Sequence, residues 1–135
     1  MKSMIIRIAY IFLIVLIGCK GYVFQKQITN EIYLVAVDSR EQMTLSYRLP
    51  EGTYIGIIGE TIIWTGWEPR MNRIMVKQYL KAENKIRYFA IDLNKDYAFG
   101  YRSDGVVEFN ERNFSKIILD SGKLRSSITE LYSGE

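Results

Sequence analysis

Met43-Thr44-Leu45-Ser46-Tyr47-Arg48-Leu49 is the stretch that decides the fold, because its apolar and polar residues alternate with a period of two. This alternation predicts a β-strand with one face on a core and the other face in water. A strand that is apolar on one side only indicates an antiparallel sheet. Pro50-Glu51-Gly52 follows directly, and a fixed φ before a permissive glycine predicts a tight turn after which the chain reverses.

Further runs of β-branched and aromatic residues flank this strand and predict about seven strands in all. The run before it, 32–37, is continuously apolar and suits a strand that is buried on both faces. The runs 54–58 and 61–65 are separated only by Gly59-Glu60, which predicts a two-residue hairpin. The remaining runs are expected to form two more hairpins, 73–79 with 86–93, and 97–102 with 106–109 around Ser103-Asp104-Gly105.

The pattern changes at Asn110, a residue type that caps helices. Phe114, Ile117 and Ile118 then share one face at spacings of three and four, which predicts a helix near 111–121 that ends at Gly122. Beyond it, Leu124, Ile128 and Leu131 would allow a further short helical turn. We therefore predict a β-rich α+β domain: an antiparallel sheet, as a small sandwich or open barrel, with one C-terminal helix over a face or an end.

The start of the chain has the layout of an export signal, with Lys2 and Arg7 ahead of an apolar run that extends to Ile17. The run is short for a bilayer-spanning helix, which needs roughly 20 apolar residues, so a signal-anchor helix that buries an inert cysteine fits less well. The run closes with Leu16-Ile17-Gly18-Cys19, which resembles the lipobox of bacterial lipoproteins.

This resemblance implies that Cys19 carries a diacylglyceryl group and becomes the N-terminus after cleavage behind Gly18. The resemblance covers about the first 20 residues and implies a signal peptide at 1–18. From the residues that follow, we expect a lipidated N-terminus with a tether or first strand at 19–30 and one globular domain at 31–135. Two or more acyl chains give a stable anchor, whereas one binds a membrane reversibly. The expected location is the cell envelope, at the outer membrane or at the outer leaflet of the cytoplasmic membrane.

Composition excludes several classes of function. Removal of residues 1–18 from the 135 leaves 117, enough for a single core. Without Lys2 and Arg7 the 18 basic side chains become 16, against 15 acidic ones, so the basic excess expected of a nucleic-acid binder is lacking. With no histidine and one cysteine, the chain lacks the residues for His/Cys zinc sites, a Ser-His-Asp triad or the common haem ligands. We predict no metal and no cofactor.

Trp64 and Trp67 are the candidate ligand contacts, because exposed aromatic rings can stack on sugars or peptides. On one continuous strand, residues three apart point to opposite faces, so the alternative is one ring in the core and one over a loop. The tyrosines would mark an interaction surface if several gathered on one solvent face. Two of the carboxylates Glu60, Glu68, Asp92 and Asp96 could in principle form a glycosidase pair, but turn and surface roles are commoner and we predict no catalytic residue.

A second, weaker resemblance covers about half of the chain. The order of Ile74-Met75-Val76-Lys77-Gln78, Tyr88-Phe89-Ala90-Ile91-Asp92 and a Phe114-centred helix is similar to small uncharacterised lipoprotein domains of bacterial envelopes, and it brings no activity. We expect a non-enzymatic envelope lipoprotein that binds another envelope protein, as an inhibitor, immunity protein or scaffold. The alternative is a carbohydrate- or peptidoglycan-binding module that uses Trp64 or Trp67. A small glycan hydrolase is a less favoured alternative.

Overall fold

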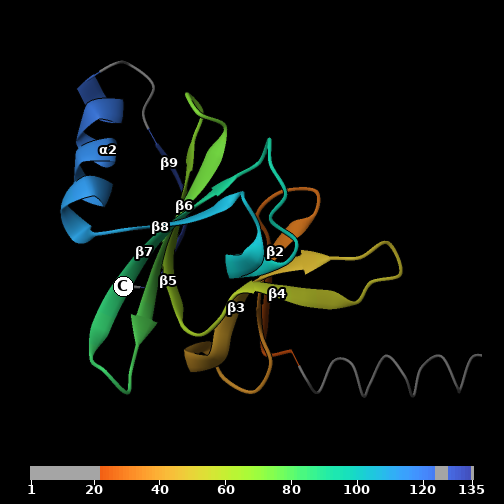
Figure 1. Ribbon diagram of the computed structural model, residues 1–135. Coiled ribbons are helices and arrows are strands. Elements are labelled where there is room, and N and C mark those ends of the chain that lie inside the picture. The colour runs from red at the N-terminus through yellow and green to blue at the C-terminus, as the bar shows by residue number, and fades with distance from the viewer. Residues whose placement is uncertain (1–21, 124–127, 135) are drawn as a thin grey trace, which may run out of the picture.

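The computed structural model describes residues 22–123 and 128–134, which form two antiparallel sheets and one α-helix (Figure 1). The four-stranded sheet has the order β1-β2-β3-β4, with β1 Phe24–Gln27, β2 Ile32–Ala36, β3 Met43–Arg48 and β4 Tyr54–Ile58. The five-stranded sheet has the order β8-β7-β6-β5-β9, with β5 Ile62–Glu68, β6 Arg73–Leu80, β7 Lys85–Asp92, β8 Val106–Phe109 and β9 Thr129–Ser133. The helix α2 spans Glu111–Lys123, and short 3-10 helices lie at η1 Arg40–Gln42 and η2 Gly100–Arg102.

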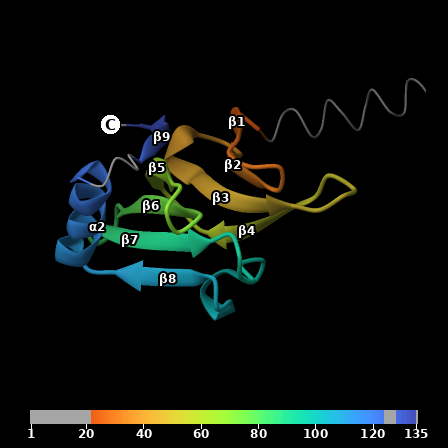
Figure 2. The same ribbon diagram turned by 90° about the horizontal axis from the view of Figure 1, so that it is seen from above.

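The elements stack in three layers, with the five-stranded sheet between the four-stranded sheet and α2 (Figures 1 and 2). The main core fills the space between the sheets, where Leu34 and Leu45 meet Val76 and Phe89. A smaller cluster on the other face of the five-stranded sheet packs Met75 and Ala90 against Phe114 of α2. The predicted β-rich α+β class is therefore confirmed, in its sandwich form, and the described residues form nine strands where about seven were predicted.

Local patterns predicted several elements well. The alternating stretch forms β3, with Met43 and Leu45 fully buried and Arg48 exposed. The turn after it is closed by the bond from Gly52 N–H to the Leu49 carbonyl, and the φ of +100° at Gly52 explains why glycine stands there. The hairpin of β6 and β7 is also confirmed.

The helix is confirmed with its cap, because the Asn110 side chain accepts a 2.8 Å bond from the Asn113 N–H. Two details differ from the prediction. The helix continues past Gly122 to Lys123, and residues near Leu131 form β9 in place of a further helical turn. Strand β9 pairs with β5 across more than sixty positions of sequence, a partner that a local pattern does not reveal.

Two predicted hairpins are wrong. Strands β4 and β5 do not pair: β4 pairs with β3, whereas β5 pairs with β6 and β9, so Gly59-Glu60 carries the chain from one sheet to the other. Residues 97–102 are not a strand, since they contain η2, and β8 pairs with β7 instead. The loop is folded on itself by the bond from Gly105 N–H to the Asp96 carbonyl, and the φ of +62° at Gly100 does not suit a strand.

Of the two alternatives for 19–30, the described part is a first strand: Phe24–Gln27 form β1, which pairs with β2. Cys19, together with the rest of the lipobox and the leader, lies outside the described residues. Among the described residues, no helix is long and apolar enough to cross a membrane.

Candidate binding surface

Three tyrosines gather on the face of the four-stranded sheet that points away from the core. The Tyr54 ring on β4 meets the Tyr22 and Tyr33 rings edge-on, each with ring centres 5.6 Å apart. Tyr33 follows buried Ile32 on β2, and Arg48 follows the inward Tyr47 on β3, so both side chains point outward. We call Tyr22, Tyr33, Tyr54, Arg48 and Gln25 the tyrosine face.

Strand pairing brings these residues together. Tyr54 is the register partner of Arg48 on β3, and the Gln25 side chain on β1 donates a hydrogen bond to the Tyr54 hydroxyl. Tyr33 lies on β2 between them. Because each member comes from a different strand or from the segment before β1, the sheet fixes their spacing and the face is preorganised.

Arg48 gives the tyrosine face its charge. Its guanidinium donates a 3.3 Å hydrogen bond to the Tyr33 hydroxyl and lies 5.4 Å from the centre of the Tyr33 ring. The hydrogen bond to Tyr33 raises the pKa of Arg48, with further electrostatic contributions from Tyr33 and Tyr54. The side chains that shift this pKa are both tyrosines, and within the described ranges Arg48 takes part in no ion pair. The exposed guanidinium can therefore accept an anion from outside.

Trp64 is a packing residue. It lies under α2, where its ring meets Phe114 edge-on at 6.2 Å and its Nε1 donates a 2.8 Å hydrogen bond to Glu130. The ring covers Gly66, where a Cβ would lie only 2.4 Å from a ring carbon of Trp64. Trp64 thus belongs to the cluster between the sheet and the helix, as the packing alternative predicts.

Trp67 points to the opposite face of β5 and remains 38% exposed. It lines a small apolar pocket of about 250 Å³ with Ile28, Leu93, Leu131 and neighbouring polar side chains. The two tryptophans do not form a common platform, because one faces α2 and the other this pocket. Trp67 is the one that a ligand could touch.

Three of the four carboxylates considered for catalysis accept hydrogen bonds from groups nearby in the sequence. Glu68 is buried, with its Oε2 accepting a 3.0 Å bond from Arg73 Nε and a 3.2 Å bond from the Met71 N–H. Asp92 and Asp96 accept bonds from backbone N–H groups two residues further on, as turn residues do. Glu60 is exposed in the crossing between the sheets. The structure thus gives Glu68, Asp92 and Asp96 structural hydrogen bonds.

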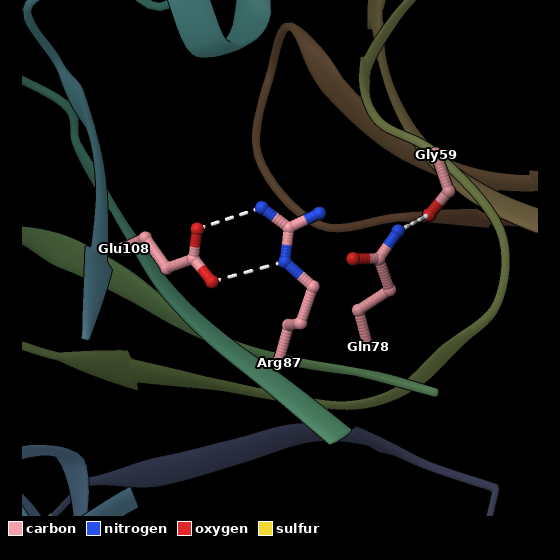
Figure 3. A network of polar contacts seen from close by, with 4 residues as sticks. All are labelled: Gly59, Gln78, Arg87 and Glu108. Atoms are coloured by element: carbon pink, nitrogen blue, oxygen red, sulfur yellow. Dashed lines mark hydrogen bonds and ion pairs between the residues drawn. The ribbon is translucent and has the colours of Figure 1, made fainter. Parts of the chain in front are cut away.

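A second polar group lies on β6, β7 and β8 (Figure 3). Arg87 holds Glu108 through two bonds of 2.9 and 2.6 Å. Gln78, the register partner of Arg87, is only 3% exposed and donates 2.8 Å bonds to the Gly59 and Glu60 carbonyls. Because this amide ties the crossing between the sheets to β6, we assign the network a structural role.

The remaining chemistry of the described residues is sparse. In residues 22–123 and 128–134, no group of three or more histidine, cysteine or acidic side chains could hold a metal ion.

The sequence signal that could have located the tyrosine face was present in part, since the polar positions of the alternating stretch include Arg48. The tyrosines of the face come from other strands, however, and strand order was needed to place them.

Comparison with models of protein families, with curated proteins and with solved structures finds no match for this chain.

Proposed function

We propose that this protein is a non-enzymatic lipoprotein of the bacterial cell envelope, and that its β-rich domain binds another envelope component through the tyrosine face. The observation that carries the proposal is the face itself: three edge-packed tyrosines beside a guanidinium that takes part in no ion pair among the described residues. Tyrosine and arginine are enriched at binding surfaces because they offer large contact area together with hydrogen-bond donors.

The lipobox-like stretch supports the location. A lipid on Cys19 would keep the domain at the membrane, where a nearby target is met at high effective concentration without any added contact. Binding suits the rest of the geometry too, because the buried Glu68 and the turn carboxylates Asp92 and Asp96 have structural hydrogen-bond partners.

The second candidate is a carbohydrate- or peptidoglycan-binding module. Trp67 favours it, as an exposed ring beside an apolar pocket. The pocket of about 250 Å³ is small compared with ligand sites of roughly 300–1,000 Å³, so it suits one side chain or one small group better than a glycan chain.

Affinity capture from detergent-solubilised envelopes tests the proposal. The full-length native protein is used as bait, and bound protein, glycan and lipid are all identified by mass spectrometry. Wild type should retain at least one component that Arg48→Ala and Tyr54→Ala lose. A component lost only on Trp67→Ala would support the carbohydrate reading instead.

Matched controls separate the face from general damage. Arg70→Ala removes an exposed arginine in the turn between β5 and β6, and Tyr101→Ala removes an exposed ring in η2. Both should bind as wild type does. If the controls weaken binding as much as Arg48→Ala and Tyr54→Ala, the tyrosine face is not the binding surface.

A further inference from the structure

The tyrosine face lies where the chain enters the domain. Tyr22, the first described residue, is itself a member of the face through its contact with Tyr54. Cys19 stands three residues earlier. An extended chain spans at most about 3.6 Å per residue, so the backbones of Cys19 and Tyr22 lie within about 11 Å of each other.

We propose that the partner of the tyrosine face is the membrane surface itself, with the tyrosine rings among the lipid headgroups and Arg48 on a lipid phosphate. This rests on the proposed function, because the lipid on Cys19 brings the face to the bilayer. It also deepens that function, since it names the component that the face binds.

The chemistry of the face fits this occupant. Tyrosines gather at membrane–water interfaces because each ring combines an apolar body with a polar hydroxyl. Tyr22 is 38% exposed and Val23, which follows it, is 54% exposed, so apolar surface continues beside the face.

Charge complementarity points the same way. The guanidinium of Arg48 is exposed, and the groups that shift its pKa are Tyr33 and Tyr54, with no carboxylate among them. A guanidinium matches the geometry of phosphate oxygens, which can accept two parallel hydrogen bonds from it. Exposed Lys81 and partly buried Arg87, by contrast, are each paired with a glutamate.

The reach of the chain disfavours a protein as the occupant. A small domain is about 30 Å across, whereas the backbone of Tyr22, one member of the face, is tied within about 11 Å of Cys19. A lipid surface needs no such room. With the tyrosine face on the bilayer, the five-stranded sheet and α2 lie on the side away from the membrane, since they form the opposite layers of the domain (Figure 2).

The test is made on the native lipidated protein, after mass spectrometry has shown the lipid on Cys19. The protein is placed in nanodiscs of phosphatidylethanolamine and phosphatidylglycerol that contain some lipid with a nitroxide on its headgroup. Amide NMR signals of Tyr33, Arg48 and Tyr54 should lose intensity strongly, while those of Phe114 and Leu119 in α2 stay sharp. Stronger broadening in α2, or equal broadening in both layers, would overturn the proposal.

Variants test the named contacts. Arg48→Gln should lower the ratio of membrane-docked to undocked domains about fivefold, which is the effect of one basic residue at an anionic surface. Arg70→Gln should leave this ratio unchanged. For the wild-type protein, neutral phosphatidylcholine nanodiscs should lower the same ratio about as much as Arg48→Gln does. If the signals of the face stay sharp in the lipidated protein and a captured protein is lost with Arg48→Ala, the face binds a protein and not the membrane, and the proposed function still holds.

If mass spectrometry finds no lipid on Cys19, the proposed lipoprotein itself fails, before the membrane contact is tested.

Discussion

The buried ion pair of Glu68 and Arg73 gives the sharpest stability prediction. The Glu68 side chain is 1% exposed and the Arg73 side chain 18% exposed, with Arg73 Nε 3.0 Å from Glu68 Oε2. The same carboxylate oxygen accepts the Met71 N–H at 3.2 Å, which closes the turn between β5 and β6. Arg73→Ala would remove the cation and leave a buried carboxylate with one backbone donor.

The cost follows from burial. Removal of one partner of a buried pair costs about 3–5 kcal/mol, because the remaining charge stays out of water. Since the Arg73 side is partly exposed, water can enter the space left by alanine, and we expect about 3 kcal/mol, the lower end of that range. Glu68→Gln should cost only about 1–2 kcal/mol, because the amide oxygen can still accept the Met71 N–H.

Urea unfolding of the full-length protein in mild detergent, followed by tryptophan fluorescence, measures these changes. The midpoint should fall while the slope of the transition stays the same. The double variant Glu68→Gln/Arg73→Ala should cost less than the sum of its parts, with a coupling of about 2 kcal/mol, as expected for residues in contact. A loss below about 1 kcal/mol for Arg73→Ala, or strict additivity, would refute the assignment of Glu68 to a structural role.

Three further predictions concern α2 and two titrating groups. Phe114→Ala should cost about 3–5 kcal/mol in urea unfolding, because the buried ring joins α2 to the five-stranded sheet, and a loss below about 1 kcal/mol would contradict that layer. The hydrogen bonds from Arg87 lower the pKa of Glu108, so the pair stabilises the fold above about pH 4.3, and this stabilisation is lost as the pH falls through the lowered pKa. Glu108→Gln should lose about 0.5–1 kcal/mol of stability at pH 7 and show a shallower acid transition. Burial, and then the hydrogen bond to Glu31, raises the pKa of Tyr97, so its contribution to stability is complete below about pH 10 and is lost as the pH rises further. The urea midpoint of wild type should therefore be lower at about pH 11 than at about pH 8, whereas Tyr97→Phe should have nearly the same midpoint at both pH values.

Local physical patterns were sufficient for elements whose partners are close in the chain. The alternation at Met43–Leu49, the turn at Gly52 and the β6–β7 hairpin needed only neighbouring residues, and so did the cap at Asn110. The sequence at Gly59-Glu60 resembles a hairpin turn. The buried residues on either side of it, Ile58 and Ile62, however, belong to two different sheets. Strand β9 depends on pairing with β5, which no nearby residue indicates.

The candidate surface shows the same limit. The spacing of Trp64 and Trp67 correctly placed them on opposite faces, but only the structure shows that Trp64 lies under α2. The tyrosine face could not be assembled from sequence, because Tyr22, Tyr33 and Tyr54 are brought together by the order of four strands. Composition showed that an excess of tyrosines on one solvent face would mark an interaction surface, whereas the location of that face required the fold.

Mass spectrometry of the N-terminal peptide from the native, membrane-extracted protein tests the central claim most directly. We predict a chain that begins at Cys19 and carries a diacylglyceryl group on its thiol. In that case Cys19→Ser should remain unmodified and lose the lipid-dependent membrane attachment. An uncleaved leader followed by an unmodified Cys19 in the wild-type protein would contradict the claim, because the domain would then have no lipid to hold the tyrosine face at the membrane.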